Sequence, residues 1–192
     1  MADDLKKAFE KEVRAAAGHR FVVDTFADMV RAMALSIEGA TVMGERVAAI
    51  EKEYDQIKAR YTRDEFEHFF AAFVLVMSAL DARREDFLGH ALEALGASNT
   101  RNGQFLTPVD VSRMMASVLC PEPADYKPGQ VIKLNDCACG TSVLLIEGAE
   151  RLLSQGVVRS FVFGQEVHLY PFLASASKSY DLILVFLCLH LV

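Results

Sequence analysis

The stretch VIKLNDCACGTSVLLIE, residues 131–147, carries the strongest signal of fold in the chain. Its apolar start, 131–134, predicts a β-strand, the small residues of 136–142 predict a turn, and the apolar spacing after Val143 predicts a helix. In an open α/β sheet such a turn lies at the carboxyl end of the strand, where backbone N–H groups and the helix dipole face a ligand. Alone, the turn does not separate a ligand site from an ordinary strand-to-helix connection.

Two further stretches flank this turn: Gly-Gln-Phe-Leu-Thr-Pro at 103–108 and Gly-Gln-Glu at 164–166. In this order the three stretches resemble the adenine-N6 DNA methyltransferases, specifically the modification subunits of type I restriction systems and their orphan relatives. Those proteins carry Gly-Gln-Phe-Phe-Thr-Pro, then Asp-Pro-Ala-Cys-Gly-Thr-Gly-Gly, then an acidic residue that ends the second strand. The resemblance covers about residues 100–168 and implies methyl transfer from S-adenosylmethionine to the exocyclic amine of adenine.

The resemblance implies a cofactor site built from three segments. The loop 104–109 would fold over the methionine end of S-adenosylmethionine, the turn 136–142 would hold the cofactor, and the acidic residue would accept its ribose hydroxyls, a task that suits paired carboxylate oxygens. For that acidic residue the alternative is an ordinary surface glutamate. The candidate site residues are Gln104, Phe105, Leu106, Thr107, Pro108, Val109, Asp136, Ala138, Cys139, Gly140, Thr141, Ser142 and Glu166.

The chain departs from the family pattern within the turn and in the catalytic loop. Cys137 replaces the proline, while Ser142 and the β-branched Val143 replace two glycines. N6 methylation also needs an Asn- or Asp-Pro-Pro-aromatic loop, which aligns the adenine amino group and stacks on the flipped base. The 192 residues contain no such tetrapeptide, so no catalytic residue is assigned. We expect this chain alone to be inactive, and its status as an enzyme stays open.

The composition indicates a globular protein but does not explain how the chain would bind DNA. Hydrophobic residues make up 52% of the chain. It has 20 basic and 26 acidic side chains, which gives a net charge of −6. Phosphate neutralisation needs clustered Lys and Arg, so DNA would be held through missing regions or partner restriction-modification subunits. The start of the chain lacks the apolar core of a signal peptide, which favours the cytoplasm with its four cysteines reduced. No metal site and no membrane span are expected.

We predict an α/β protein with an N-terminal all-helical domain at 1–100 and a partial Rossmann-like methyltransferase domain at 101–192. Helices are predicted at 5–17, 21–35, 42–60, 62–80 and 86–95, and a capping box joins Thr62 to Glu65. A helix capped by Thr107 is expected to begin at Pro108. Because residues 131–192 can supply only about three strands, the sheet is expected to be truncated. An apolar stripe is predicted to face the core or the next domain, and its members are Phe66, Phe69, Phe70, Phe73 and Met77.

Two other functions remain open at this stage. The helical part could be a non-enzymatic interaction module that binds a restriction-modification subunit through its apolar stripe, or the chain could be a degenerate remnant without activity. The DNA target and the oligomeric state do not follow from the sequence.

Overall fold

The computed structural model describes residues 2–82, 86–96, 107–120, 122, 131–136, 139–156 and 160–164. The chain divides into two compact units, one made of residues 1–83 and 90–98, the other of residues 84–89 and 99–192. The short helix α5 (Phe87–Ala94) crosses this division. Each unit is described by itself, and the predicted domain boundary at residue 100 stays a prediction.

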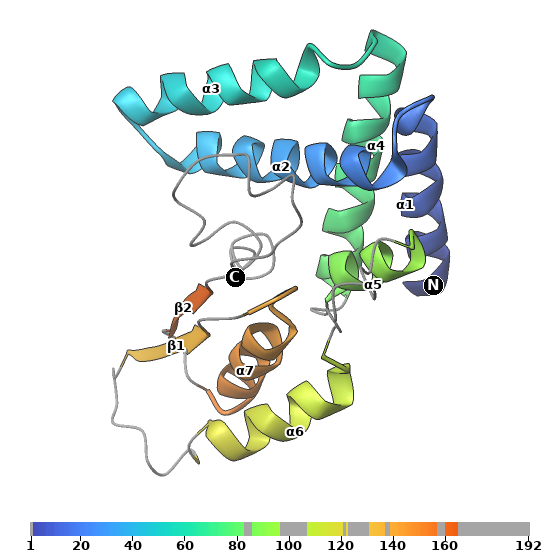
Figure 1. Cartoon of the computed structure of the whole chain (residues 1–192). Coiled ribbons are helices and arrows are strands. Elements are labelled where there is room, and N and C mark those ends of the chain that lie inside the picture. Colours follow the sequence, from blue (N-terminus) through green and yellow to red (C-terminus); the bar gives the residue numbers. More distant parts are fainter. Residues whose placement is uncertain are drawn as a thin grey trace. The chain divides into compact units, whose positions relative to one another are not determined.

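The first unit is a set of packed helices: α1 (Ala2–Ala17), α2 (Val22–Thr41), α3 (Glu45–Lys58) and α4 (Arg63–Ala82) (Figure 1). Helix α1 packs against α4 and α2, and α2 packs against α3. Fully buried large side chains from three helices form the core, and each contributes roughly 1.5–3 kcal/mol by leaving water; they include Phe9, Val13, Met29, Leu35 and Val76. The helices predicted for this region are confirmed.

Helix α2 runs six residues beyond its predicted end at residue 35. A glycine inside a helix costs about 1 kcal/mol relative to alanine, which is why Gly39 suggested a break. The helix nevertheless continues through Gly39, because α2 packs along α3. A Cβ built on Gly39 would lie 3.5 Å from Cγ2 of Ile50 on α3, an ordinary van der Waals contact, so this packing does not require a glycine.

The capping box that opens α4 is confirmed, whereas the predicted apolar stripe is only partly right. The backbone N–H of Glu65 donates to the Thr62 hydroxyl at 3.2 Å, and the N–H of Thr62 donates to the Glu65 carboxylate at 2.8 Å. On the inner face of α4 the buried residues are Phe69, Ala72, Val76, Ala79 and Leu80. Phe70 follows Phe69 by one position, about 100° around the helix, and is 72% exposed.

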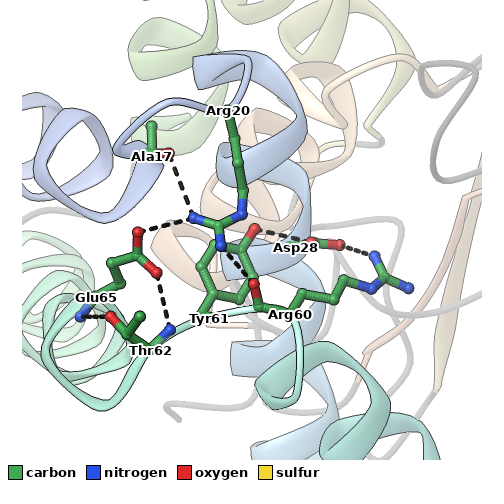
Figure 2. A network of polar contacts seen from close by, with 7 residues as sticks. All are labelled: Ala17, Arg20, Asp28, Arg60, Tyr61, Thr62 and Glu65. Atoms are coloured by element: carbon green, nitrogen blue, oxygen red, sulfur yellow. Dashed lines mark hydrogen bonds and ion pairs between the residues drawn. The ribbon is translucent and has the colours of Figure 1, made fainter.

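A polar network centred on Arg20 joins the α1–α2 connection to the start of α4 (Figure 2). The Arg20 guanidinium donates to Glu65 at 2.9 Å and to the backbone carbonyl of Arg60, and it lies 4.5 Å from the ring centre of Tyr61. The Tyr61 hydroxyl donates to Asp28 at 2.8 Å. Burial, followed by this hydrogen bond to Asp28, raises the pKa of Tyr61, so the hydroxyl keeps its proton. The network fixes the α3–α4 connection against α2.

Glu65 gives this network a pH dependence that can be measured. The hydrogen bond from Arg20, then that from the Thr62 backbone, lowers the pKa of Glu65 from 4.5 to about 2. A carboxyl whose pKa is lower in the folded state stabilises the fold above its unfolded pKa and loses that effect as pH falls toward the folded pKa. We therefore expect the free energy of unfolding of the wild type to exceed that of Glu65→Gln at pH 6, and the difference to shrink between pH 4.5 and about 2.

Urea unfolding of both proteins across this pH range measures the difference. Glu67→Gln is the matched control, because Glu67 is 70% exposed and its contact with Arg63 is 3.5 Å long. A wild-type advantage over Glu65→Gln that stays constant from pH 6 to pH 2 would contradict the role assigned to Glu65.

The second unit holds α6 (Val109–Leu119), β1 (Ile132–Asp136), α7 (Val143–Ser154) and β2 (Ser160–Gly164). The two strands pair in parallel, with Ile132 opposite Ser160 and Asp136 opposite Gly164. Helix α7 connects them along the chain and contacts both strands and α6 (Figure 1). The turn predicted between 136 and 142 thus lies between a strand and a helix.

The predicted fold class, α/β with a partial Rossmann-like sheet, is wrong for the part of the chain that the structure describes. That part is mostly helical, with seven helices against two strands of five residues each. A Rossmann-like sheet is not present among these residues. The prediction extended one strand–turn–helix signal into a partial Rossmann-like sheet, whereas most of the described chain lies in helices with their own apolar faces.

Close packing of α7 on β1 depends on a small residue in the helix. Cys120 and Leu152 are buried and pack with Ile132 and Leu134. A Cβ built on Gly148 of α7 would lie 3.2 Å from Cδ1 of Leu134, so the bare backbone allows strand and helix to approach. Arg113 of α6 donates to Glu147 of α7 at 3.1 Å and ties the two helices together. None of the described helices is both long enough and apolar enough to cross a membrane.

Candidate functional site

The turn that leads from β1 into α7 contains two residues with left-handed backbone. Gly140 has φ +53° and Ser142 has φ +67°, and Ser142 is the single non-glycine residue with positive φ in the described segments. The backbone N–H of Ser142 donates to the Cys139 carbonyl at 2.7 Å, and the Ser142 carbonyl accepts the first helical bond from Ile146. These dihedral angles and hydrogen bonds redirect the chain from the strand into the helix.

Ser142 occupies the N-cap position of α7 without acting as a side-chain cap. Its hydroxyl makes no hydrogen bond to the first turn, and the residue is 1% exposed with no partner for Oγ among the residues that the structure describes. A left-handed backbone costs an ordinary L-residue about 1–2 kcal/mol. The resembling family has glycine at this position, which agrees with the dihedral angle found here. Val143, the other departure from the family, is the first residue of α7 and is buried, so its side chain lies in the core.

A buried carboxylate holds the middle residue of the turn. The Thr141 hydroxyl donates to Oδ2 of Asp86 at 2.5 Å, and the backbone N–H of Gly89 donates to Oδ1 of the same residue at 2.8 Å. Asp86 is 7% exposed and Thr141 is 6% exposed. Asp86 is not among the site residues predicted from the sequence. An aspartate before a helix signals an N-cap, but nothing in the sequence relates it to a threonine 55 residues later.

The predicted loop residues lie partly within the described chain. Thr107 and Pro108 are exposed and precede α6, whose first residue is Val109. The prediction that Thr107 caps this helix is wrong, because the helix begins one residue later and Pro108 stands at the N-cap without a side-chain hydrogen bond. Five candidates lie outside the described residues: Gln104, Phe105, Leu106, Ala138 and Glu166.

The described residues of the turn suit a polar ligand that approaches the backbone. A Cβ built on Gly140 would meet no atom within 4 Å, so this side of the turn is open. The first N–H groups of α7 receive no hydrogen bond acceptor from the N-cap side chain, and they lie at the positive end of the helix dipole. Asp136 ends β1 with a half-buried carboxylate. A bare backbone, a helix N-terminus that its N-cap side chain does not cap and a nearby carboxylate are groups of the kind that bind polar ligands.

Cysteine and metal chemistry contribute little to this arrangement. Burial raises the pKa of the Cys120 thiol, and its Sγ lies 3.7 Å from the carbonyl of Gly148, which makes it a packing residue. Cys139 is half-buried beside Gly140. Within the described segments no three His, Cys, Asp or Glu side chains gather as metal ligands do.

Comparison with known proteins agrees with the resemblance noted in the sequence. A family model described as N-6 DNA Methylase matches residues 83–176, a span that contains the turn, α6, α7 and Asp86. This match confirms the resemblance to the adenine-N6 DNA methyltransferases that was recognised from the sequence. Comparisons with curated proteins and with solved structures returned no match.

The backbone of Ser142 leads to a prediction about stability. Glycine adopts positive φ without steric cost, and Ser142→Gly also removes a buried hydroxyl that has no partner in the described segments. We expect Ser142→Gly to raise the free energy of unfolding by about 1 kcal/mol. This value allows for the greater conformational entropy that glycine, compared with serine, loses when the chain folds. Urea unfolding followed by circular dichroism measures this change.

Ser112→Gly provides the control. Ser112 is also fully buried with an unpartnered hydroxyl, but it lies inside α6, where glycine costs about 1 kcal/mol. We expect that variant to lose stability. Equal losses in both variants would show that Ser142 bears no backbone strain.

Proposed function

We propose that this chain is the S-adenosylmethionine-binding portion of a DNA adenine-N6 methyltransferase. The observation that carries the proposal is the turn 140–142, with its open side at Gly140 and, after it, the N-terminus of α7, which the Ser142 side chain does not cap. Family membership of residues 83–176 supports this cofactor, since adenine-N6 methylation needs a methyl donor. When bound, S-adenosylmethionine supplies the methyl group, and the residues of the chain bind and orient it.

Each predicted segment has a separate task in this proposal. The turn residues Asp136, Ala138, Cys139, Gly140, Thr141 and Ser142 form the floor, where the α7 N–H groups donate to polar atoms of the cofactor and the Asp136 carboxylate accepts from its donors. Glu166 accepts the ribose hydroxyls. Its role is supported by the pairing of Asp136 with Gly164, because Glu166 follows Gly164 by two residues. The loop Gln104, Phe105, Leu106, Thr107, Pro108 and Val109 covers the methionine end.

Methyl transfer to DNA requires parts that these 192 residues do not supply. No Asn- or Asp-Pro-Pro-aromatic sequence is present to align the adenine amino group, and the charge balance lacks a basic excess. We propose that DNA and the catalytic loop meet this site through other regions or through restriction-modification subunits of type I kind, in the cytoplasm. DNA as the substrate is supported by the family of residues 83–176.

A second candidate function is an interaction module formed by the first unit. Phe70 and Val74 lie one helical turn apart on α4 and are 72% and 47% exposed. Such exposed apolar side chains favour a protein contact, and a modification or specificity subunit is the proposed partner. Co-purification of such a subunit with the wild type, and its loss with Phe70→Ser, would support this candidate.

Gly140 and Gly156 offer a matched test of the cofactor site. Both glycines have positive φ and open space around a built Cβ, and they lie at opposite ends of α7. Asparagine tolerates left-handed backbone, so Gly→Asn adds a side chain at each place with similar strain. We expect Gly140→Asn to weaken S-adenosylmethionine binding at least ~10-fold by blocking access to the turn, a loss of about 1.4 kcal/mol. Gly156→Asn should leave affinity within about twofold.

Isothermal titration calorimetry of the full chain with S-adenosylmethionine and S-adenosylhomocysteine measures both affinities. Thermal unfolding of the variants checks that they lose similar stability. Equal weakening by both substitutions would locate binding away from the turn, and no heat from the wild type at millimolar ligand would remove the proposed function.

We expect the isolated chain to transfer no methyl group to DNA, because the loop that aligns the adenine amino group is absent from its sequence. Incubation of the 192-residue chain with DNA and radiolabelled S-adenosylmethionine measures transfer. Labelling of adenine that disappears in Gly140→Asn would contradict this expectation and would show that the chain carries its own catalytic group.

A further inference from the structure

The two carboxylate oxygens of Asp86 accept hydrogen bonds from residues that are far apart in the sequence. Oδ1 accepts from the backbone N–H of Gly89 at 2.8 Å and so caps the first turn of α5. Oδ2 accepts from the Thr141 hydroxyl at 2.5 Å, 55 residues along the chain. The carboxylate is 7% exposed, and a buried charged acceptor that loses a partner costs more than a surface one.

Gly89 leaves the space that the Asp86 carboxylate occupies. A Cβ built on Gly89 would lie 2.1 Å from Oδ2 and 2.6 Å from Oδ1 of Asp86, closer than any real contact. The carboxylate therefore packs directly on the bare backbone of α5. Contacts with α5 alone therefore fix the position of the carboxylate, independently of Thr141.

Thr141 is the point where the turn receives a side-chain hydrogen bond. It stands between two residues with left-handed backbone, Gly140 and Ser142. Gly140 has no side chain, and the buried hydroxyl of Ser142 has no partner among the described residues. Because Thr141 donates its hydroxyl proton to Asp86, its rotamer is set and the turn is anchored on a carboxylate rather than on water.

We propose that Asp86 is a positioning residue for the cofactor turn and acts through the Thr141 hydroxyl. This inference rests on the proposed function, since the turn must bind S-adenosylmethionine for its position to matter. Asp86 itself touches no cofactor atom in this account. It holds Gly140 and the start of α7 in the conformation that receives the ligand, and it also caps α5.

The two tasks of Asp86 can be separated by substitution. Asp86→Ser keeps an N-cap oxygen for Gly89 but has no second oxygen for Thr141, whereas Asp86→Ala loses both contacts. We expect both variants to raise the dissociation constant for S-adenosylmethionine about tenfold, while Asp86→Ser recovers most of the thermal stability that Asp86→Ala loses. If Asp86 only capped α5, Asp86→Ser would recover both the thermal stability and the affinity that Asp86→Ala loses.

A double-variant cycle tests whether Asp86 acts through Thr141. In a Thr141→Val background we expect Asp86→Ser to change the dissociation constant by less than about twofold, because the partner hydroxyl is already gone. Thr62→Val is the control, since it removes a capping hydroxyl of the same type in the first unit. It should lower stability and leave affinity unchanged.

The outcomes distinguish this inference from the proposed function. The positioning role alone would be overturned if the wild type bound S-adenosylmethionine and Asp86→Ser bound it with the same affinity. It would also be overturned if the fold-changes in the dissociation constant caused by Asp86→Ser and Thr141→Val multiplied in the double variant. Absence of wild-type binding at millimolar S-adenosylmethionine would remove the proposed function and the cofactor role of Asp86 with it. Amide hydrogen exchange at Ser142, whose N–H donates to Cys139, should be faster in Asp86→Ser than in the wild type; equal rates would show that Asp86 does not hold the turn.

Discussion

The left-handed backbone at Gly140 and Ser142 is the constraint on which the second unit depends. These dihedral angles let a strand that ends at Asp136 pass within a few residues into a helix that begins at Val143. The same angles leave Gly140 open and keep the α7 N–H groups free of the N-cap side chain. The conformation that connects the two elements therefore also places an open backbone beside a helix N-terminus, and the proposed cofactor site depends on this arrangement.

Strain at the turn is compensated by contacts elsewhere in the unit. Thr141 is held by Asp86, Val143 is buried, and Gly148 lets α7 approach Leu134 of β1. In the first unit the Arg20–Glu65 pair plays a comparable part at the start of α4, where it adds a charged partner to an ordinary capping box. Polar networks of this kind stabilise one geometry because each of their partners is fixed.

Local sequence signals predicted the elements well and their assembly less well. The helices of the first unit, the Thr62–Glu65 capping box and the strand–turn–helix at 132–143 follow from spacing, caps and small residues. The family was also recognised from three short motifs. The Rossmann-like sheet is absent from the described residues, because one such motif does not determine how many strands follow. Asp86 could not be found either, since its link to Thr141 is a tertiary contact without a local pattern.

The central claim is that the turn at 140–142 receives S-adenosylmethionine, and backbone amide NMR during a titration tests it most directly. The account predicts saturable shifts of the Gly140, Thr141 and Val143 amide signals, with the Gly156 signal at the other end of α7 unchanged. Saturable shifts confined to other residues, or no shifts at millimolar ligand, would contradict the account.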